Sequence, residues 1–481
     1  MELYKRSAAE LSALIKSKSC SVEEVIKSTF DRITQVEGKV DAYITICEQD
    51  ALTKAREVDS KIAKGEKLHP LAGIPIGIKD NISTKGILTS GASKMLSNYI
   101  PPYNATVIDK INSIDMIITG KTNLDEFAMG STTETSYYKP TKNPHNLAKT
   151  PGGSSGGSAA AVSAGQAILS LGSDTGGSIR TPAAFCGVVG LKPTYGAVSR
   201  FGLIALASSL DQIGPIGRTV TDVAMLYPIL CGHDKMDATT KKVEHSDYGK
   251  NLSSDIRDIT IGIPAEYFNL NLNDEVREAT MKAIEKYKEL GCNIKEVSLP
   301  SNKYALPTYQ IISSAEASSN LGRYDGVKFG YRAEDYSNLT EMYVNTRSEG
   351  FGDEVKSRIL LGTFALSAEG YNDYYHKAKL MQEQISNEFA EVLGECDAIL
   401  TPTTLGTAFD LGANMSNETD SCTVAVNLAG LPAISLPCGV DRDSMPIGMQ
   451  IIGKKFDEQT LLNLAFAFEQ TSDTVKMPEI V

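Results

Sequence analysis

The segments Thr150-Pro-Gly-Gly-Ser154-Ser155-Gly-Gly-Ser158 and Gly172-Ser-Asp-Thr-Gly176-Gly177-Ser178-Ile-Arg180 are the most informative part of the chain. Both place serines between glycines, and no histidine lies between them. Glycine permits positive φ and brings bare backbone N–H groups close to a ligand. A serine beside such groups can act as a nucleophile at an oxyanion site. Two flexible linkers are the alternative, but the apolar runs 159–162 and 167–169 between the segments instead predict a buried helix.

Other glycine-rich motifs fit this window less well. A phosphate-binding loop needs lysine after its last glycine, whereas Ser158 follows Gly157. The spacings Gly152-x-Ser154-x-Gly156 and Gly153-x-Ser155-x-Gly157 match a nucleophile elbow, which must follow a strand. Residues 143–151 instead predict a loop, so we interpret these matches as accidental.

Lys79 is the stronger candidate for a catalytic base. A Ser-His-Asp enzyme is not excluded by count, but His233, His245 and His376 lie in contexts typical of surface positions. The apolar run 71–78 predicts a buried strand that ends at Lys79. Burial can lower the pKa of a lysine by several units and so provide a base near neutral pH. A lone lysine at a strand end is more often a solvated charge, yet the two glycine-framed serines favour catalysis.

Together these motifs resemble the amidase signature family. The stretches around Lys79, Ser154 and Ser178 match its Ser–Ser–Lys triad, and the similarity continues through 187–194, 208–215, 427–435 and 446–452. The resemblance implies that Ser178 is the nucleophile, Ser154 a bridging serine after a cis peptide bond, and Lys79 the base. It also implies an oxyanion hole formed by the backbone N–H groups around Thr175, Gly176, Gly177 and Ser178.

The middle of the chain resembles one branch of that family, the A subunits of the glutamyl-tRNA(Gln)/aspartyl-tRNA(Asn) amidotransferases. The matching segments are 124–132, 305–326 and 358–367. The branch hydrolyses glutamine by way of an acyl-enzyme and supplies the ammonia that converts Glu-tRNA(Gln) to its amide; Asp-tRNA(Asn) is left open as a second acceptor. It implies a heterotrimer in which a B subunit holds the misacylated tRNA and uses ATP and Mg, and a small C subunit wraps the pair. No cofactor is implied for this chain.

Three residues outside the signature are expected to bind glutamine. By the resemblance, Arg358 holds the α-carboxylate and Tyr309 lines the site. Asp420, which is matched to the family's aspartate by its Asp-x-x-Thr spacing, binds the α-ammonium. A guanidinium fork suits a carboxylate, although from the sequence alone Arg358 is better explained as an exposed helix charge. The chain departs from the branch pattern at 420–425, and Glu418 is close enough to compete with Asp420.

Charge and cysteine content set further limits. The net charge of −12 over 481 residues argues against direct binding of nucleic acid, which needs clustered Lys and Arg. No signal peptide opens the chain, and no run reaches the ~18 apolar residues of a membrane helix. The eight cysteines form no CxxC pair, which favours reduced cytosolic thiols and disfavours a zinc site. We therefore expect a cytoplasmic protein without membrane or metal.

The alternation of apolar strands and helices predicts an α/β fold, and the resemblance to the amidase signature family implies one domain over residues 1–481 with a mixed sheet covered by helices on both faces. Residues 1–65 predict a helical region, 71–230 the signature core, and 233–258 a surface excursion. Strands are expected near 116–119, 167–171, 188–191, 259–263, 398–400, 433–436 and 447–451, with helices over 274–290 and 458–470.

Three rival functions follow from the same residues. One is a free-standing amidase of the same family that acts on small or fatty amides. A non-enzymatic glycine-rich nucleotide binder is disfavoured by the failed phosphate motifs, and a pure scaffold is disfavoured by the complete triad.

Overall fold

A single mixed β-sheet runs through the computed structural model, which describes residues 2–413, 417–472 and 475–480. In these residues eleven strands follow the spatial order β1-β3-β2-β4-β6-β5-β10-β11-β9-β7-β8. The strands are β1 (Tyr43–Ile46), β2 (Pro75–Lys79), β3 (Ile117–Thr122), β4 (Leu169–Asp174), β5 (Val189–Lys192), β6 (Gln212–Gly217), β7 (Thr260–Pro264), β8 (Asn293–Val297), β9 (Ala398–Pro402), β10 (Ala433–Val440) and β11 (Pro446–Gly453).

The sheet has parallel pairs on either side of an antiparallel middle, and its edge strand β1 runs antiparallel to β3. Strand β2 runs parallel to β3 and β4, and β7 runs parallel to β8 and β9. The pairs from β4 through β6, β5, β10 and β11 to β9 are antiparallel. Parallel strands need crossover connections, so helices alternate with these strands along the chain. The predicted mixed α/β sheet is confirmed.

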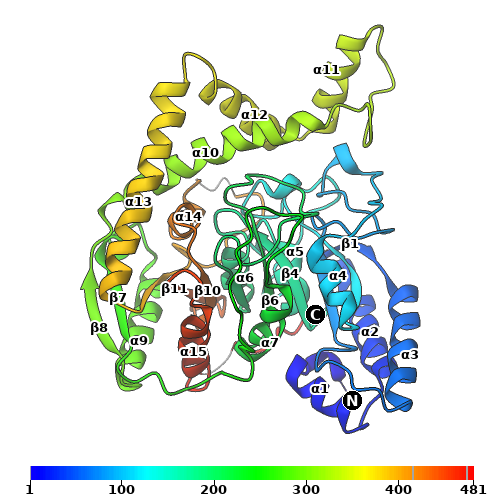
Figure 1. Cartoon of the computed structure of the whole chain (residues 1–481), viewed down its shortest axis with the longest axis vertical. Coiled ribbons are helices and arrows are strands. Elements are labelled where there is room, and N and C mark those ends of the chain that lie inside the picture. The colour runs from blue at the N-terminus through cyan, green and yellow to red at the C-terminus, as the bar shows by residue number, and fades with distance from the viewer. Residues whose placement is uncertain (1, 414–416, 473–474, 481) are drawn as a thin grey trace.

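Helices cover both faces of this sheet (Figure 1). Along β11, Gly448 lies against Ala184 of α6, whereas Gly453 lies against Leu461 of α15. Because side chains alternate between faces along a strand, these two contacts lie on opposite sides. The helices are α1 (Ala8–Lys16), α2 (Val22–Val40), α3 (Glu48–Ala63), α4 (Thr106–Ser113), α5 (Gly156–Ser163), α6 (Arg180–Cys186), α7 (Val220–Leu230), α8 (Ala265–Phe268), α9 (Asp274–Glu289), α10 (Ala305–Asn320), α11 (Leu339–Gly350), α12 (Asp353–Ala365), α13 (His376–Glu395), α14 (Val424–Leu428) and α15 (Glu458–Glu469).

Two sequence expectations about secondary structure are wrong. The N-terminal region is not wholly helical, because Tyr43–Ile46 forms strand β1 beside β3. The apolar runs 159–162 and 167–169 do not share one helix: α5 ends at Ser163, and Leu169 begins β4, which confirms the strand expected near 167–171. Both apolar runs are buried, so burial alone did not distinguish helix from strand.

A capping box at Ser21 opens α2. The Ser21 side chain accepts from the Glu24 backbone N–H, and the Glu24 side chain accepts from the Ser21 backbone N–H, at the start of α2. Residues 233–258 contain no helix or strand in the structure, and Tyr248 packs there against Tyr227 of α7.

Helices α10, α12 and α13 extend beyond one side of the sheet, and α11 reaches farthest from it (Figure 1). Helix α10 packs against both α12 and α13. The close approach of α12 to α10 depends on Gly362, since a Cβ there would fall 1.9 Å from the carbonyl oxygen of Ser314. This helical layer carries Tyr309 and Arg358, while the sheet carries Lys79.

Candidate active site

Lys79 ends β2 inside the protein, not at its surface. Its side chain is fully buried, because β2 lies between β3 and β4 in the sheet. Burial lowers the pKa of Lys79 to about 7, while the nearby charges of Asp125, Asp174 and Asp211 favour its ammonium form. A substantial fraction of this lysine is therefore a neutral amine near pH 7.

Three serine side chains surround the Lys79 amine. Its Nζ lies 2.8 Å from the Oγ of both Ser154 and Ser155, and 2.9 Å from the Oγ of Ser173. Ser155 Oγ donates to the carbonyl of Ser173 at 3.0 Å, so toward Lys79 it acts as an acceptor. The Ser154 hydroxyl makes no other hydrogen bond within the described residues. Ser154 is therefore free to give its proton to the lone pair of neutral Lys79.

Ser178 lies in the short turn between β4 and α6. Its side chain is 7% exposed, unlike the fully buried Ser154. No hydrogen bond among the described residues joins the Ser178 hydroxyl to Ser154, although the Ser155 N–H donates to the Ser178 carbonyl at 3.0 Å. The peptide bond between Gly153 and Ser154 is cis, as expected. The structure thus contains the first link of the expected relay, between Lys79 and Ser154, but not the second.

The backbone beside Ser178 offers unused donors. Within the described residues, no hydrogen bond uses the N–H groups of Thr175, Gly176, Gly177 or Ser178. The Gly177 backbone, at φ 147°, lies in the region that favours glycine, and a Cβ there would fall 2.3 Å from Oγ1 of Thr423. Preorganised, unpaired N–H groups beside a hydroxyl provide what stabilisation of an oxyanion requires.

A buried ion pair holds this turn in place. Arg180 donates from Nε and Nη2 to the two carboxylate oxygens of Asp174, each at 3.1 Å, and both side chains are inaccessible to solvent. Despite burial, the Arg180 charge helps lower the pKa of Asp174 to about 2. Asn427 adds a donor to Asp174 at 2.9 Å, and Gln450 accepts from Arg180 at 2.9 Å. The turn that bears Ser178 is thereby fixed to α14 and β11.

The structure brings Tyr309, Arg358 and Asp420 into one electrostatic neighbourhood. Burial raises the pKa of Asp420 to about 7, and the Arg358 charge opposes that shift. Burial also raises the pKa of Tyr309, which is likewise influenced by Arg358 and Asp420. Thr423 connects this group to the Ser178 turn, because its Oγ1 donates to the Gly176 carbonyl at 2.6 Å and its N–H donates to the Asp420 carbonyl at 2.9 Å.

Arg358 is not the exposed helix charge that its sequence context favours. Its side chain is 23% exposed, and its Nε donates to Glu354, one turn earlier in α12, at 2.7 Å. Among the described residues, the Nη atoms have no hydrogen-bond acceptor. The end of the guanidinium fork is thus available for a carboxylate.

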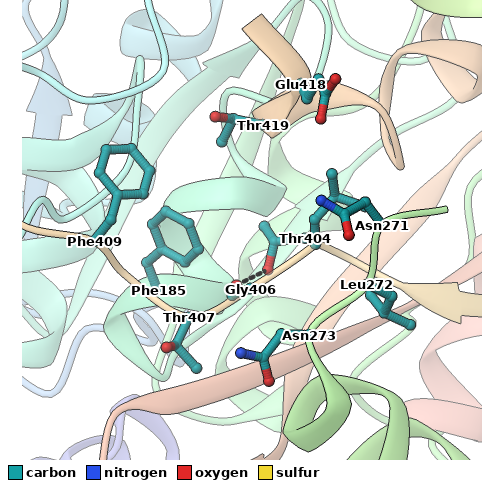
Figure 2. Close-up of a pocket in the computed structure, with 11 residues that line it drawn as sticks. Phe185, Asn271, Leu272, Asn273, Thr404, Gly406, Thr407, Phe409, Glu418 and Thr419 are labelled. Atoms are coloured by element: carbon teal, nitrogen blue, oxygen red, sulfur yellow. Dashed lines mark hydrogen bonds between the residues drawn. The ribbon is translucent and has the colours of Figure 1, made fainter. Parts of the chain in front are cut away.

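Glu418 lies elsewhere. It is exposed and lines a separate cavity of about 380 Å³, together with Thr419, Phe185 and the loop that follows β9 (Figure 2). Glu418 and Asp420 both belong to the short 3₁₀ helix η7 (Asn417–Asp420), yet Asp420 is the one that interacts with Arg358.

Histidine has no place in this site. None of the hydrogen bonds made by the five histidines in the described residues reaches Lys79, Ser154 or Ser178. His233 and His376 are exposed, and His245 is half-buried beside Tyr248. Sequence reasoning missed Ser173 and Asn81, which donates to Ser173 Oγ at 2.9 Å, since nothing in the sequence distinguishes them.

The comparisons with known proteins agree with this geometry. The family model described as Amidase matches residues 24–462. The chain therefore belongs to the amidase family, and the resemblance seen in the sequence is confirmed.

Within the family, the similar proteins include the A subunits of glutamyl-tRNA(Gln) amidotransferases. The chain is 55% identical to the A subunit from Carboxydothermus hydrogenoformans, over 98% of both chains. It is 51% identical to the A subunit from Desulforamulus reducens, over the full length of both. The crystal structure of the A subunit from Thermotoga maritima matches with a TM-score of 0.83 and 40% identity, covering 100% of this chain and 98% of that one.

No helix within residues 2–413, 417–472 and 475–480 is long and apolar enough to span a lipid bilayer.

Proposed function

We infer that this chain is the glutamine-hydrolysing A subunit of a tRNA-dependent amidotransferase. The full-length identity of 51–55% to subunits of that name supports this function over a free-standing amidase. The observation that carries it is the joint placement of a buried lysine–serine pair and a free guanidinium fork. The pair fits amide cleavage, and the fork fits an amide substrate that also bears a carboxylate.

The proposed chemistry begins with proton transfer. Neutral Lys79 takes the proton of Ser154, and Ser154 takes that of Ser178 as the Ser178 Oγ attacks the amide carbon. The N–H groups of the turn stabilise the resulting oxyanion, and one such donor is worth roughly 3–4 kcal/mol. The C–N bond then breaks, ammonia leaves with the proton returned through Ser154, and an ester to Ser178 remains. Water then attacks the ester and gives its proton through Ser154 to Lys79. The proton returns to the Ser178 oxygen as glutamate leaves.

Substrate recognition is assigned to the three residues of the helical side. Arg358 binds the α-carboxylate of glutamine through its Nη atoms, Asp420 binds the α-ammonium as a carboxylate, and Tyr309 forms the wall against the Ser178 turn. Asp420 is preferred to Glu418 because it interacts with Arg358, whereas Glu418 lines a different cavity.

The chain is proposed to work in the cytoplasm within a heterotrimer. Free ammonia from glutamine is useful only where an activated acyl group receives it. We assign that activation, with ATP and Mg, to a B subunit, which also provides most of the binding of Glu-tRNA(Gln). A C subunit joins the A and B subunits. The net charge of −12 fits an A subunit that does not itself hold tRNA.

A glutaminase assay tests this function. The full chain is purified from its own cells with any accompanying subunits, and ammonia release from glutamine is measured with and without ATP and misacylated tRNA. We expect weak hydrolysis by the isolated chain and stimulation by its partners. The Ser178→Ala variant should be inactive in each case. A monomer that cleaves simple amides at full rate and ignores tRNA would instead identify a free-standing amidase.

A further inference from the structure

Glu126 is buried between the catalytic loops and the helix that carries Arg358. It opens the short 3₁₀ helix η3 (Glu126–Ala128), and only 3% of it is exposed. One carboxylate oxygen accepts from Ser93 Oγ at 2.5 Å, and the other accepts from the backbone N–H of Gly352 at 2.9 Å. No step of the proposed chemistry uses this carboxylate.

Gly352 is the N-cap of α12, and no side chain of its own segment caps that helix. Glu126 takes this role from a distant part of the sequence, because its carboxyl oxygen accepts from the N-cap N–H as a local capping side chain would. The contact is close, since a Cβ on Gly352 would fall 2.4 Å from Oε2 of Glu126. Arg358 follows Gly352 by about 9 Å along the helix at 1.5 Å per residue.

Apart from the Glu126 contact, helix α12 is anchored by its packing on α10. Its buried residues are Val355, Gly362 and Ala365, whereas Leu360 is 71% exposed. Arg358 thus lies between two fixed points, the Glu126 contact at the helix start and the packing of Gly362 on α10. Loss of the first point would leave Val355 as the buried helix residue on the N-terminal side of Arg358.

The residue before Glu126 contacts the catalytic loop. Asp125 donates its backbone N–H to the carbonyl of Ser154 at 3.3 Å, and its carboxylate lies against Gly153. The residue after Glu126 contributes as well, because the ring of Phe127 packs on that of Phe351 with centroids 5.7 Å apart. Three consecutive residues therefore join the Ser154 loop to the start of α12.

We propose that Glu126 is a positioning residue for substrate selection, which sets the place of Arg358 relative to the catalytic serines by capping α12. This inference rests on the proposed glutaminase function. It assigns Glu126 no contact with substrate: the carboxylate acts through Gly352 and the helix. Its loss should therefore impair only those substrates that Arg358 recognises.

The test compares two amides on the full chain with its accompanying subunits. Glutamine carries the α-carboxylate, and 4-aminobutanamide is the same molecule without it. Glu126→Ala should raise the KM for glutamine about tenfold, the upper end of the loss of an uncharged hydrogen bond, and should change kcat/KM for 4-aminobutanamide by less than about twofold. Glu126→Gln keeps an acceptor for the Gly352 N–H and should remain close to wild type.

Asp353→Ala is the matched control. Asp353 is an acidic residue in the first turn of the same helix, but its side chain is fully exposed and pairs with Lys356 at 3.0 Å. We expect this variant to behave like wild type. If Glu126→Ala does not fold, Gly352→Ala displaces the same contact and should show the same substrate split.

The double variant Glu126→Ala/Arg358→Ala separates positioning from general support. If Glu126 acts through Arg358, the double variant should be no worse on glutamine than Arg358→Ala alone. Additive losses, or equal losses on both amides, would overturn the proposal while leaving the glutaminase function intact. A wild-type protein that does not hydrolyse glutamine would overturn both, and an Arg358→Ala variant with normal KM would overturn the assignment of Arg358 and this inference with it.

Discussion

Gly176 lies directly against the ring of Tyr309, so that a Cβ on Gly176 would fall 2.6 Å from the ring atom Cζ. The two residues come from different parts of the molecule, the turn after β4 and helix α10. Their contact joins the donors of the oxyanion turn to the layer of helices that carries Arg358. It also leaves no room at this point for any residue larger than glycine.

The first prediction follows from that contact. Gly176→Ala should lower kcat for glutamine about 10²- to 10³-fold, the loss seen when one oxyanion donor is removed, because the turn must move to clear the ring. Thermal unfolding of the purified variant shows whether the fold is intact. Gly176→Ala/Tyr309→Ala removes the obstacle and should regain much of the kcat, with a raised KM because Tyr309 lines the proposed glutamine site. A Gly176→Ala variant with wild-type kcat would show that the turn tolerates displacement.

The second prediction separates two neighbouring serines. Ser154 and Ser155 lie equally close to the Lys79 amine, at 2.8 Å, but Ser155 Oγ is already bound to the Ser173 carbonyl. Ser154→Ala should therefore lower kcat about 10²- to 10⁴-fold, the range for loss of acid–base catalysis. Ser155→Ala should chiefly lower the melting temperature. Steady-state kinetics and thermal melts of both variants test this assignment. A larger kcat loss in Ser155→Ala would show that Ser155, and not Ser154, transfers the proton.

Much of the sheet could be predicted because its strands are apolar and bounded by turns. The runs that end at Lys79 and at Leu400 are examples: both predicted strands are buried in the structure. Strand β8 was missed because Asn293–Val297 is largely exposed at the sheet edge and has little apolar pattern. Strand β6 was missed because Gln212–Gly217 contains two glycines and a proline, which normally weaken a strand assignment.

The residues of the candidate site also fall into two groups, those with a local sequence signal and those without one. Ser154 and Ser178 stand out locally because glycines flank them, and Lys79 because it ends an apolar run. Arg358 carries no such signal: its place beside Tyr309 and Asp420 depends on how α10, α12 and η7 pack, which spacing along the chain does not encode. Glu126 was also invisible, since its partner Gly352 lies far away in the sequence.

The third prediction concerns the guanidinium fork. Arg358→Ala should raise the KM for glutamine about 10- to 100-fold, the equivalent of a charge-assisted contact worth roughly 1.5–3 kcal/mol. The effect on 4-aminobutanamide should be small, because that amide lacks the carboxylate. Arg358→Lys should not restore binding, since an ammonium cannot make the bidentate contact.

Glu354→Ala is the control for this fork. Glu354 holds only the Nε of Arg358, so its loss should raise the KM for glutamine far less than loss of the arginine. If Arg358→Ala harms glutamine and 4-aminobutanamide equally, the arginine supports the fold and the substrate assignment fails.

The last prediction is a pH profile whose steepness depends on the substrate. Burial brings the pKa of Lys79 down to about 7 and the pKa of Asp420 up to about 7. The lysine must be neutral to accept a proton and the aspartate must be ionised to bind an ammonium, so activity requires both groups deprotonated. Since kcat/KM reports the free enzyme, its logarithm should rise with pH below 7 with a slope near 2 for glutamine, and level off above.

Glutaramate, which is glutamine without its α-ammonium, isolates the lysine. Its binding does not need an ionised Asp420, so the slope below pH 7 should fall to about 1. Asp420→Asn should give the same slope of about 1 with glutamine, at a higher KM. Rates from about pH 5.5 to 8.5 on both amides measure these slopes. A flat profile through pH 7 would remove Lys79 as the titrating base, and equal slopes on the two substrates would remove Asp420 from ammonium binding.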